Sequence, residues 1–505
     1  MKFSHPKIKK LIEKYKTISL LEKIQSLLEW DLEINLPPKA AKVRAEQMAF
    51  LTGQRTDLWL DSEFRSLLEY LTEHQEKLTE KERAMIRNLN HAGKYYFKVP
   101  KKIILEISKI TTKAFPVWKK AKEENKFSNF LPYLKKIFEL SQSVAEHLGY
   151  KENPYDALLD LYEPQLTTKD CRKIFSEIGP FLSKFLKRIK KSPKYQLESK
   201  IANSKAFYPK DTQKQLAQFL LKKMGFDFEA GRMDESVHPV TFWNARFDVR
   251  ITTRYQKNDF RPSLTAAIHE GGHALYEQGI NPDFEGTPLE SGVSLGIHES
   301  QSRFWENQIC RNPAFLEFLT PILQALYPKE LSNISTKDIV LFFNQVKPSL
   351  IRTEADEVTY NLHVMLRFEL EDDLINERIK PKDLPEIWRA KMRKYLGIEP
   401  KTDREGVLQD VHWSAGLVGY FPTYTLGNLY AAQIAAKMRE KLNIEKLLER
   451  GQLKPILNWL RKEIHQYGSL YWPKELIKKA TGQKLNSKFF IKYIEKKYEK
   501  IYAIK

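Results

Sequence analysis

Two histidines and a glutamate stand at HExxH spacing within the segment RPSLTAAIHEGGHALYEQGINP. Pro262 suits a helix start and Gly279 a helix end, so the segment predicts one helix that carries His269 and His273. Residues four apart on a helix lie above one another, about 6 Å apart along the axis, so both imidazoles can reach one divalent cation. Glu270 points away by roughly 100° and is free to hold a water molecule beside the metal. The spacing therefore predicts a metal site with hydrolytic chemistry.

A catalytic zinc ion takes three protein ligands and keeps one position open, so a third ligand is required. Glu277 repeats the four-residue step, but the eight residues after His269 span roughly 12 Å of helix, which excludes it by geometry. We favour Glu299 in GIHESQSRFWENQIC, because it stands near the start of a predicted helix and follows His273 at a distance that suits a return helix. The residues alone leave two alternatives open: Glu290 and His298.

Gly271 and Gly272 occupy the middle of the predicted metal-binding helix. Glycine in a helix interior is less favourable than alanine by about 1 kcal/mol. A neighbouring element or a substrate pressed against the helix backbone would explain both residues.

The elements that position these side chains are predicted to be mainly helical. Apolar residues recur at steps of three and four from Ile8 to Ile18, and again from Phe490 to Tyr498. Most of the chain between has the same period, interrupted by turns that contain proline or glycine. The chain has no 20- to 50-residue repeat and no linker-like stretch, which favours a single domain over residues 1–505.

One stretch, residues 240–255, is rich in β-branched and aromatic residues and predicts a strand. Its apolar and polar side chains alternate, so each set should lie on one face. The apolar set is Phe247, Val249 and Ile251, and the polar set is Asp248, Arg250 and Thr252. Because the strand ends shortly before the metal motif, it could line a cleft.

The composition is that of an ordered protein with a basic surface. Lysine and arginine number 84 against 64 aspartate and glutamate, a formal net charge of +20, yet the basic runs are interleaved with glutamates or aliphatic residues at helical spacing. This favours a solvated surface over a nucleic-acid interface. Only two cysteines occur, Cys171 and Cys310, which argues against a disulfide framework and predicts buried thiols. No apolar run approaches the roughly 20 residues of a membrane span, so the expected location is the cytoplasm.

Five motifs, in order along nearly the whole chain, resemble those of the carboxypeptidase Taq family of thermostable metallocarboxypeptidases. They are DVRIT at 248–252, HEGGH at 269–273, HESQSR at 298–303, IRTEAD at 351–356 and GVLQDVHW at 406–413. The resemblance begins around Trp30, where Leu36 precedes Pro37 and the family commonly has methionine. Val240 is a second departure, since the family usually has phenylalanine after the His-Pro pair that begins at His238.

The resemblance implies a fold like that of neurolysin and angiotensin-converting enzyme, with a deep groove and a small antiparallel β-sheet beside the active site. Helices of roughly residues 1–100 would cap the groove, and roughly residues 236–430 would form the active-site segment. The resemblance also implies a homodimer that releases single amino acids from peptide C-termini with broad specificity. It strengthens the choice of Glu299 as third ligand.

General chemistry assigns a role to each group. Zinc lowers the pKa of a bound water towards ~7 and polarises a carbonyl, while cobalt accepts the same ligands. Glu270 would take the proton of the water and return it to the leaving amine. The oxyanion of the tetrahedral intermediate needs a second donor, and GYFPTYTLGN supplies Tyr420 and Tyr424. The resemblance favours Tyr420, with His412 and His238 as further donors to the substrate; each tyrosine could instead be an ordinary packed residue.

An exopeptidase must also recognise a terminal carboxylate, which a guanidinium binds in bidentate fashion. Arg352 and Arg250 are the candidates, and either could instead be a structural ion pair, such as Arg352 with Asp356 at helical spacing. Two alternative functions stay open. One is an endo-oligopeptidase of the same fold, and the other is a basic nucleic-acid-binding helical protein with an incidental HExxH.

Overall fold

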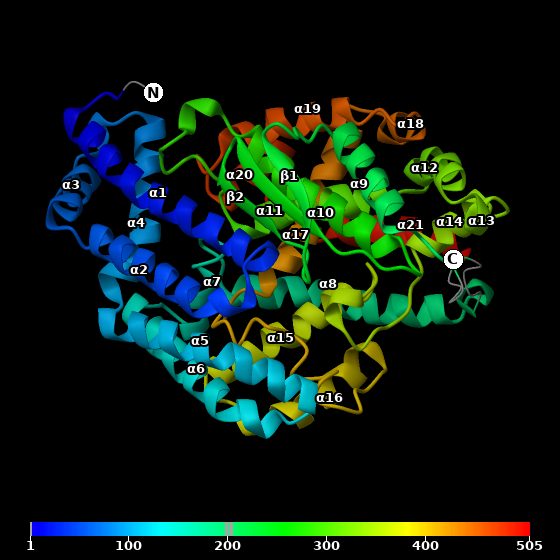
Figure 1. Cartoon of the computed structure of the whole chain (residues 1–505), viewed down its shortest axis with the longest axis horizontal. Helices are drawn as coiled ribbons and strands as arrows, with labels where there is room; N and C mark the ends of the chain where they lie inside the picture. The colour runs from blue at the N-terminus through cyan, green and yellow to red at the C-terminus, as the bar shows by residue number, and fades with distance from the viewer. Residues whose placement is uncertain (1–2, 197–200, 202–205, 505) are drawn as a thin grey trace. The chain divides into compact units, whose positions relative to one another are not determined.

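The computed structural model of the chain describes residues 3–196, 201 and 206–504, and most of them are helical (Figure 1). Contacts divide the chain into two units, each built from three segments. The first unit comprises Met1–Gly93, Glu198–Phe343 and Tyr430–Leu485, and the second comprises Lys94–Leu197, Asn344–Leu429 and Asn486–Lys505. The prediction of a mainly helical protein is confirmed.

The first unit contains most of the helices and all three strands that the described residues form. Its elements are α1 (Pro6–Ile34), η1 (Pro38–Ala40), α2 (Ala41–Trp59), α3 (Ser62–Glu73), η2 (Gln75–Lys77), α4 (Glu80–Lys98), α9 (Lys210–Met224), β1 (Gly231–Glu235), β2 (Thr241–Ala245), β3 (Asp248–Thr253), α10 (Arg261–Gly279), η4 (Pro282–Phe284), α11 (Leu295–Arg303), η5 (Phe304–Cys310), α12 (Pro313–Leu326), α13 (Pro328–Leu331), α14 (Thr336–Phe343), α17 (Pro422–Arg439), α18 (Ile444–Glu449), α19 (Lys454–Glu463), η8 (His465–Tyr467) and α20 (Pro473–Thr481). Helices α4 and α17 also have residues in the second unit.

The described residues of the second unit form helices and connecting segments and no strand. Its elements are α5 (Lys101–Glu124), α6 (Phe127–Leu148), α7 (Pro154–Leu159), α8 (Thr168–Lys190), η3 (Pro193–Gln196), η6 (Arg352–Glu354), α15 (Tyr360–Ile375), η7 (Pro381–Asp383), α16 (Leu384–Leu396) and α21 (Lys488–Tyr502). The predicted amphipathic helices at the two ends of the chain are present as α1 and α21, and each buries most of the predicted apolar stripe.

The sheet of the first unit has the strand order β1-β3-β2. Strand β2 pairs with β3 in antiparallel fashion, but β1 runs parallel to β3. The expectation of an antiparallel sheet is therefore wrong for one of the two pairings. Strand β3 is the central strand. After β1, at one edge of the sheet, the chain crosses to the opposite edge to form β2, and the β2–β3 hairpin then places β3 between them.

The stretch predicted as one strand is this hairpin. Val249 and Ile251 are fully buried, as the alternation predicts. Phe247 precedes β3, in the turn of the hairpin, and is 61% exposed. Thr252 lies on the face predicted to be polar, yet it is fully buried. Its hydroxyl is satisfied there, because it accepts a hydrogen bond from the backbone N–H of Val240 (2.9 Å). At Thr252 the polar residue thus reflects a bonded hydroxyl, whereas Asp248 and Arg250 are half-buried.

Helix α10 carries the HExxH motif and is surrounded by other elements of its unit, including β2, β3, α9 and α11 (Figure 1). It begins at Arg261, with proline in its first turn, and ends at Gly279, close to the predicted limits. Helix α11 begins at Leu295, where the Ser294 side chain accepts a hydrogen bond from the backbone N–H of Ile297. The return helix predicted to bring Glu299 back to the motif is therefore present.

The two glycines of α10 allow its neighbours to approach closely. A Cβ on Gly271 would lie 2.5 Å from a Leu221 methyl group of α9. A Cβ on Gly272 would lie 2.7 Å from the Gln301 carbonyl oxygen and 2.7 Å from the Ser302 Cα of α11. The prediction that something presses against this backbone is confirmed: the closest atoms belong to neighbouring helices.

We expect Gly272→Ala to lower the free energy of unfolding by about 1–3 kcal/mol. The added methyl group meets backbone atoms of α11, which cannot rotate away, and this overpacking outweighs a gain of about 1 kcal/mol in helix propensity. Denaturant unfolding of the metal-free protein measures the change. Gly53→Ala, inside α2 with no atom within 4 Å of its Cβ, is the control and should be stabilising; equal effects at both positions would contradict this account.

The two thiols and the apolar character of the helices are also predicted from the sequence. Cys171 and Cys310 are both buried, as predicted. Among the residues that the structure describes, no helix combines the length and the apolar character needed to cross a bilayer.

Candidate metal centre

Three side chains of the first unit converge as the sequence predicts. Nε2 of His269 lies 3.5 Å from Oε2 of Glu299, and Nε2 of His273 lies 3.4 Å from the same oxygen. All three atoms are within 4.8 Å of one another. Helix α10 supplies the two histidines and α11 the glutamate, because the glycine backbone of α10 lets α11 approach.

The spacing of these atoms fits a zinc site. Four ligands placed about 2.1 Å from zinc at the corners of a tetrahedron lie about 3.4 Å apart. The two measured separations agree with this value. Two imidazoles and one carboxylate are also a ligand set that catalytic zinc uses, with the fourth corner open. The residues present therefore fit a divalent cation: both separations to Glu299 have the expected length, and the three atoms lie within 4.8 Å of one another.

Arginines orient and neutralise the carboxylates at the centre. Arg303 Nε donates to Oε1 of Glu299 (2.6 Å), which leaves Oε2 directed at the histidines. Arg303 also reaches Glu306 (3.2 Å), and Arg311 donates to the other oxygen of Glu306 (3.0 Å). Burial alone would raise the pKa of Glu299, but Arg303 and His269 outweigh it and hold this pKa well below its usual range. The ligand is ionised without a metal.

The two histidines have different partners on their second nitrogen. Nδ1 of His269 lies 2.9 Å from Glu306 Oε2, whereas Nδ1 of His273 lies 2.6 Å from Nδ1 of His298. Burial lowers the pKa of His273 to about 3, against the opposing effect of Glu299. For His269 the carboxylates prevail over burial and raise the pKa. His273 is thus neutral, as a metal ligand must be.

Glu270, the predicted general base, is buried beside the triad and is held by the sheet. It is 6% exposed, and the Thr241 hydroxyl of β2 donates to its Oε2 (2.6 Å). Burial raises the pKa of Glu270, although His269 and Thr241 oppose the shift. A raised pKa brings a carboxylate closer to the value that suits proton transfer near neutrality.

The alternative ligands are occupied elsewhere. Glu290 accepts hydrogen bonds from Ser19 (2.6 Å) and Lys23 (2.9 Å) of α1. His298 contacts His273 through one nitrogen and Glu277 through the other (2.8 Å). Glu277 does not belong to the metal-ligand group, in agreement with its exclusion by geometry.

Two further candidates for substrate binding lie in the first unit. Arg250 of β3 pairs with Asp248 through two hydrogen bonds (2.7 and 3.0 Å), and its guanidinium lies 4.3 Å from the centre of the Trp30 ring. The pair of Arg250 with Asp248 matches the alternative role considered for Arg250 from the sequence, a structural ion pair. His238 is exposed in the segment between β1 and β2.

Arg352 lies in the second unit and is buried in a different ion pair from the one considered. Its Nε and Nη2 donate to Oδ1 of Asp410 (3.1 and 3.0 Å), and Nη1 donates to the Tyr360 hydroxyl (2.8 Å). Pairing with Asp356 is wrong, because the chain leaves the short turn η6 after Glu354 and the helical spacing does not apply. Arg367 donates to the second oxygen of Asp410 (2.6 Å), so two guanidinium groups share one carboxylate.

The other predicted residues of the second unit gather around Arg352. Nε2 of His412 lies 3.0 Å from the Tyr424 hydroxyl, and the Arg352 guanidinium lies 4.7 Å from the Tyr424 ring centre. The Tyr420 ring is 5.4 Å from the His412 ring. Burial, aided by Arg352, lowers the pKa of His412 to about 3. The structure therefore brings together Arg352, His412, Tyr420 and Tyr424, which the sequence places up to 72 positions apart (424 − 352).

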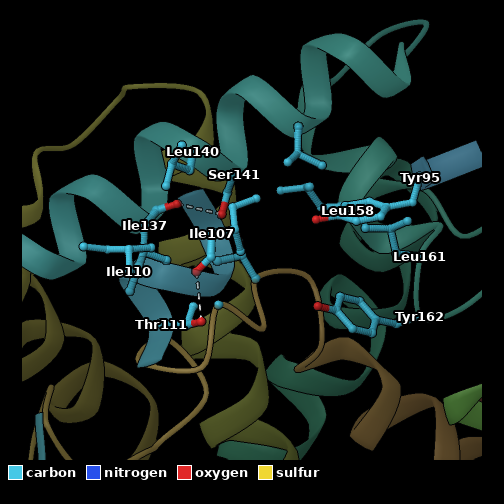
Figure 2. A pocket seen from close by; sticks show the side chains of 13 residues that line it. Tyr95, Ile107, Ile110, Thr111, Ile137, Leu140, Ser141, Leu158, Leu161 and Tyr162 are labelled. Carbon is cyan, nitrogen blue, oxygen red and sulfur yellow. Dashed lines mark hydrogen bonds between the residues drawn. The ribbon is translucent and has the colours of Figure 1, made fainter. Parts of the chain in front are cut away.

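A fully buried carboxylate holds the segment that leads to Tyr420. Glu371 of α15 accepts hydrogen bonds from Trp413 Nε1 (2.7 Å), the Gly419 N–H (2.9 Å) and the Tyr155 hydroxyl. Beside this segment a cavity of about 180 Å³ lies among α5, α6 and residues 416–418 (Figure 2). Its lining is mostly aliphatic, and Tyr162, on its wall, packs edge-on against Tyr420 at 5.4 Å.

Glu371 should make stability depend on pH. Burial raises its pKa to about 7, whereas the unfolded chain releases this proton near 4.5. Between pH 4.5 and 7 the unfolded state therefore binds fewer protons than the folded state, and the free energy of unfolding falls as pH rises, by on the order of 3 kcal/mol from this group. Denaturant unfolding of the wild type and Glu371→Gln across this window measures it. The wild type should lose stability relative to the variant as pH rises; a constant difference would contradict the assignment.

Some residues that act at the centre through other side chains are not evident from the sequence. Thr241 and Glu306 are the main examples. Arg303 stands at i+4 from Glu299, a helical spacing that could have suggested the ion pair. Glu306 lies in η5, a π-helical segment, so helical periodicity does not predict its direction.

Comparison with known proteins agrees with the motifs over nearly the whole chain. Residues 10–498 match the family model described as Carboxypeptidase Taq (M32) metallopeptidase. The chain is 42% identical over 498 residues to thermostable carboxypeptidase 1 of Pyrococcus furiosus, covering 98% of this chain and 99% of the relative. It is 39% identical over 501 residues to carboxypeptidase 1 of Bacillus subtilis, covering 99% of each.

Solved structures give the same result for the fold. The structure of Pyrococcus furiosus carboxypeptidase matches with a TM-score of 0.94 and 41% identity, covering 98% of this chain and 99% of that one. Metallocarboxypeptidase 1 of Trypanosoma cruzi matches with a TM-score of 0.94 and 36% identity, covering 97% and 99%. With the histidine and glutamate triad in place, these likenesses decide the class: the chain belongs to the carboxypeptidase Taq family and is a metallocarboxypeptidase.

Proposed function

We propose that this enzyme releases single amino acids from peptide C-termini, with broad tolerance of the side chain, and uses one Zn²⁺ per chain. The observation that carries the proposal is the convergence of His269, His273 and Glu299, whose ligand atoms lie within 4.8 Å of one another, with Glu270 buried beside them. Zinc would polarise the scissile carbonyl and activate water there, and Co²⁺ accepts the same ligands.

Glu270 is proposed as the general base. Its carboxylate takes a proton from the attacking water and delivers it to the leaving amine. The Thr241 hydroxyl donates to Oε2 of Glu270, which fixes one oxygen and leaves the other for the water. The raised pKa of Glu270 supports both halves of this transfer.

Residues of the second unit are proposed to bind the substrate. Arg352 and Arg367 share the single negative charge of Asp410, so their cluster carries one excess positive charge, which suits a terminal carboxylate. We assign the clamp to Arg352, with Arg250 as the other candidate. Tyr420 is proposed as donor to the oxyanion, and His412, Tyr424 and His238 as further contacts of the substrate.

We also propose a domain organisation, an oligomeric state and a cellular location for the enzyme. Residues 1–505 would act as one catalytic domain, in which helices of roughly residues 1–100 cap a groove and residues 236–430 form the active-site segment. Two such chains would form a homodimer that acts on peptides and binds neither nucleic acid nor membranes. Two buried thiols suit a reducing compartment, so we place the enzyme in the cytoplasm.

Timed digestion of an N-terminally blocked peptide tests the proposed reaction. Zinc-loaded enzyme should release residues one at a time from the C-terminus, and a peptide with an amidated C-terminus should be cleaved far more slowly, because it lacks the carboxylate. Internal fragments from both peptides would instead indicate an endo-oligopeptidase of this fold.

A further inference from the structure

Behind the triad, two buried side chains, His298 and Glu277, form a hydrogen-bonded chain that ends on the half-buried His273. Nδ1 of His273 lies 2.6 Å from Nδ1 of His298, and Nε2 of His298 lies 2.8 Å from Oε1 of Glu277. His298 is 5% exposed and Glu277 3% exposed. The first member is a metal-ligand candidate, whereas the other two do not belong to the ligand group.

The direction of each hydrogen bond in this chain follows from the acceptor at each end. Nε2 of His273 is the nitrogen that faces Glu299, so its lone pair is directed at the cation position and its proton must be on Nδ1. Nδ1 of His298 must then accept, which places the proton of His298 on Nε2. That nitrogen faces Oε1 of Glu277, which accepts the hydrogen bond from it. Each imidazole therefore has a single possible tautomer.

The surrounding residues hold His298 in this orientation. A Cβ on Gly292 would lie 2.8 Å from Cδ2 of His298 and 2.7 Å from the Tyr276 ring, so glycine is needed where the chain passes over both rings. The Gly292 N–H also donates to Oε1 of Glu277 (3.2 Å). Trp243 stacks on His298, with ring centres 5.1 Å apart.

The Nδ1 atoms of His269 and His273 thus have different hydrogen-bond partners. His269 donates directly to the carboxylate of Glu306, which two arginines also contact. His273 reaches a carboxylate only through a second imidazole. Partners of this kind fix the ring orientation and the basicity of a metal ligand, and their loss typically weakens metal binding 10–100-fold.

We propose that His298 and Glu277 are positioning residues for the metal: they form a relay that fixes the tautomer and the ring orientation of His273. Neither touches the cation or the substrate in this role. The inference rests on the proposed function only in that it requires a cation at the triad.

Zinc dissociation constants, measured by competition with a chelator, test the relay. His298→Phe keeps a ring that can contact Trp243 and Tyr276 but removes both nitrogens. Glu277→Met removes the acceptor from the far end, while Glu277→Gln keeps an oxygen that can accept from both His298 and Gly292. His465→Phe is the matched control, because His465 is a buried histidine that packs against the same Tyr276 ring, at the same 5.2 Å as His298, but bonds to Gln301.

The relay predicts that His298→Phe raises the zinc dissociation constant about 10–100-fold and Glu277→Met about tenfold. Glu277→Gln should stay within a few-fold of the wild type, and His465→Phe should be unchanged. Thermal unfolding of each metal-free variant separates these effects from loss of folding. If His298→Phe does not fold, the Glu277→Met and Glu277→Gln pair decides the question.

Three outcomes would overturn the relay. If His298→Phe or Glu277→Met bound zinc with wild-type affinity, the relay of His298 and Glu277 would not support metal binding. An equal loss in Glu277→Met and Glu277→Gln would show that the hydrogen bond is not what matters. A wild-type protein that binds no zinc would remove the metal site itself, and it is distinguished from failure of the relay alone because every variant would then behave like the wild type.

Discussion

Glu270→Gln is expected to retain the bound cation and to lower kcat by about 10²–10⁴-fold. Glutamine has the size of glutamate, and its oxygen can still accept the hydrogen bond from Thr241. It cannot take a proton from water, so the step that generates the nucleophile is lost while the ligands stay in place. Steady-state kinetics on a blocked peptide, together with the metal content of the same sample, measure the effect.

A glutamate on the surface of the same unit provides the control for this change. Glu285 is exposed at the end of η4, and Glu285→Gln should leave both the metal content and kcat unchanged. Full turnover in Glu270→Gln would remove Glu270 from the mechanism. Loss of the cation along with turnover would instead mean that Glu270 supports binding of the metal.

His269→Ala should abolish both metal binding and activity. It removes one of three protein ligands, and we expect the zinc dissociation constant to rise by more than the roughly 100-fold that accompanies loss of an outer partner. It also leaves Glu306 without one of its donors. Metal analysis after dialysis against a weak chelator, with activity before and after zinc is added back, measures the change.

His147→Ala, at an exposed position of α6, is the matched control and should bind zinc as the wild type does. Undiminished binding in His269→Ala would refute the ligand assignment. Activity restored by excess zinc would show instead that two ligands suffice at high metal concentration.

The local sequence accounts for the part of the site that lies on one helix. The helix of His269, Glu270 and His273 follows from residue spacing and from proline and glycine at its limits, and α10 has nearly those limits. The two glycines within it indicate a close neighbour, and α11 is that neighbour. Glu299 could be favoured over Glu290 and His298 because its distance from His273 suits a return helix and because the family resemblance supports it.

Contacts between distant segments explain what the sequence did not predict. Strand β1 has no apolar alternation, and its parallel pairing depends on β3. Arg352 has an acidic residue at helical spacing, but the chain turns away and Asp410 becomes its partner. His298 was considered as a ligand, because its chemistry allows it; only the fold shows that it contacts His273 instead.

His269, His273 and Glu299 are expected to bind one divalent cation together. Crystals of the zinc-loaded protein, measured at the zinc absorption edge, can show whether they do. We predict one strong anomalous peak in the first unit, about 2.0–2.2 Å from Nε2 of both histidines and from an oxygen of Glu299. A peak bound by other residues, or none at this position after zinc loading, would contradict the account.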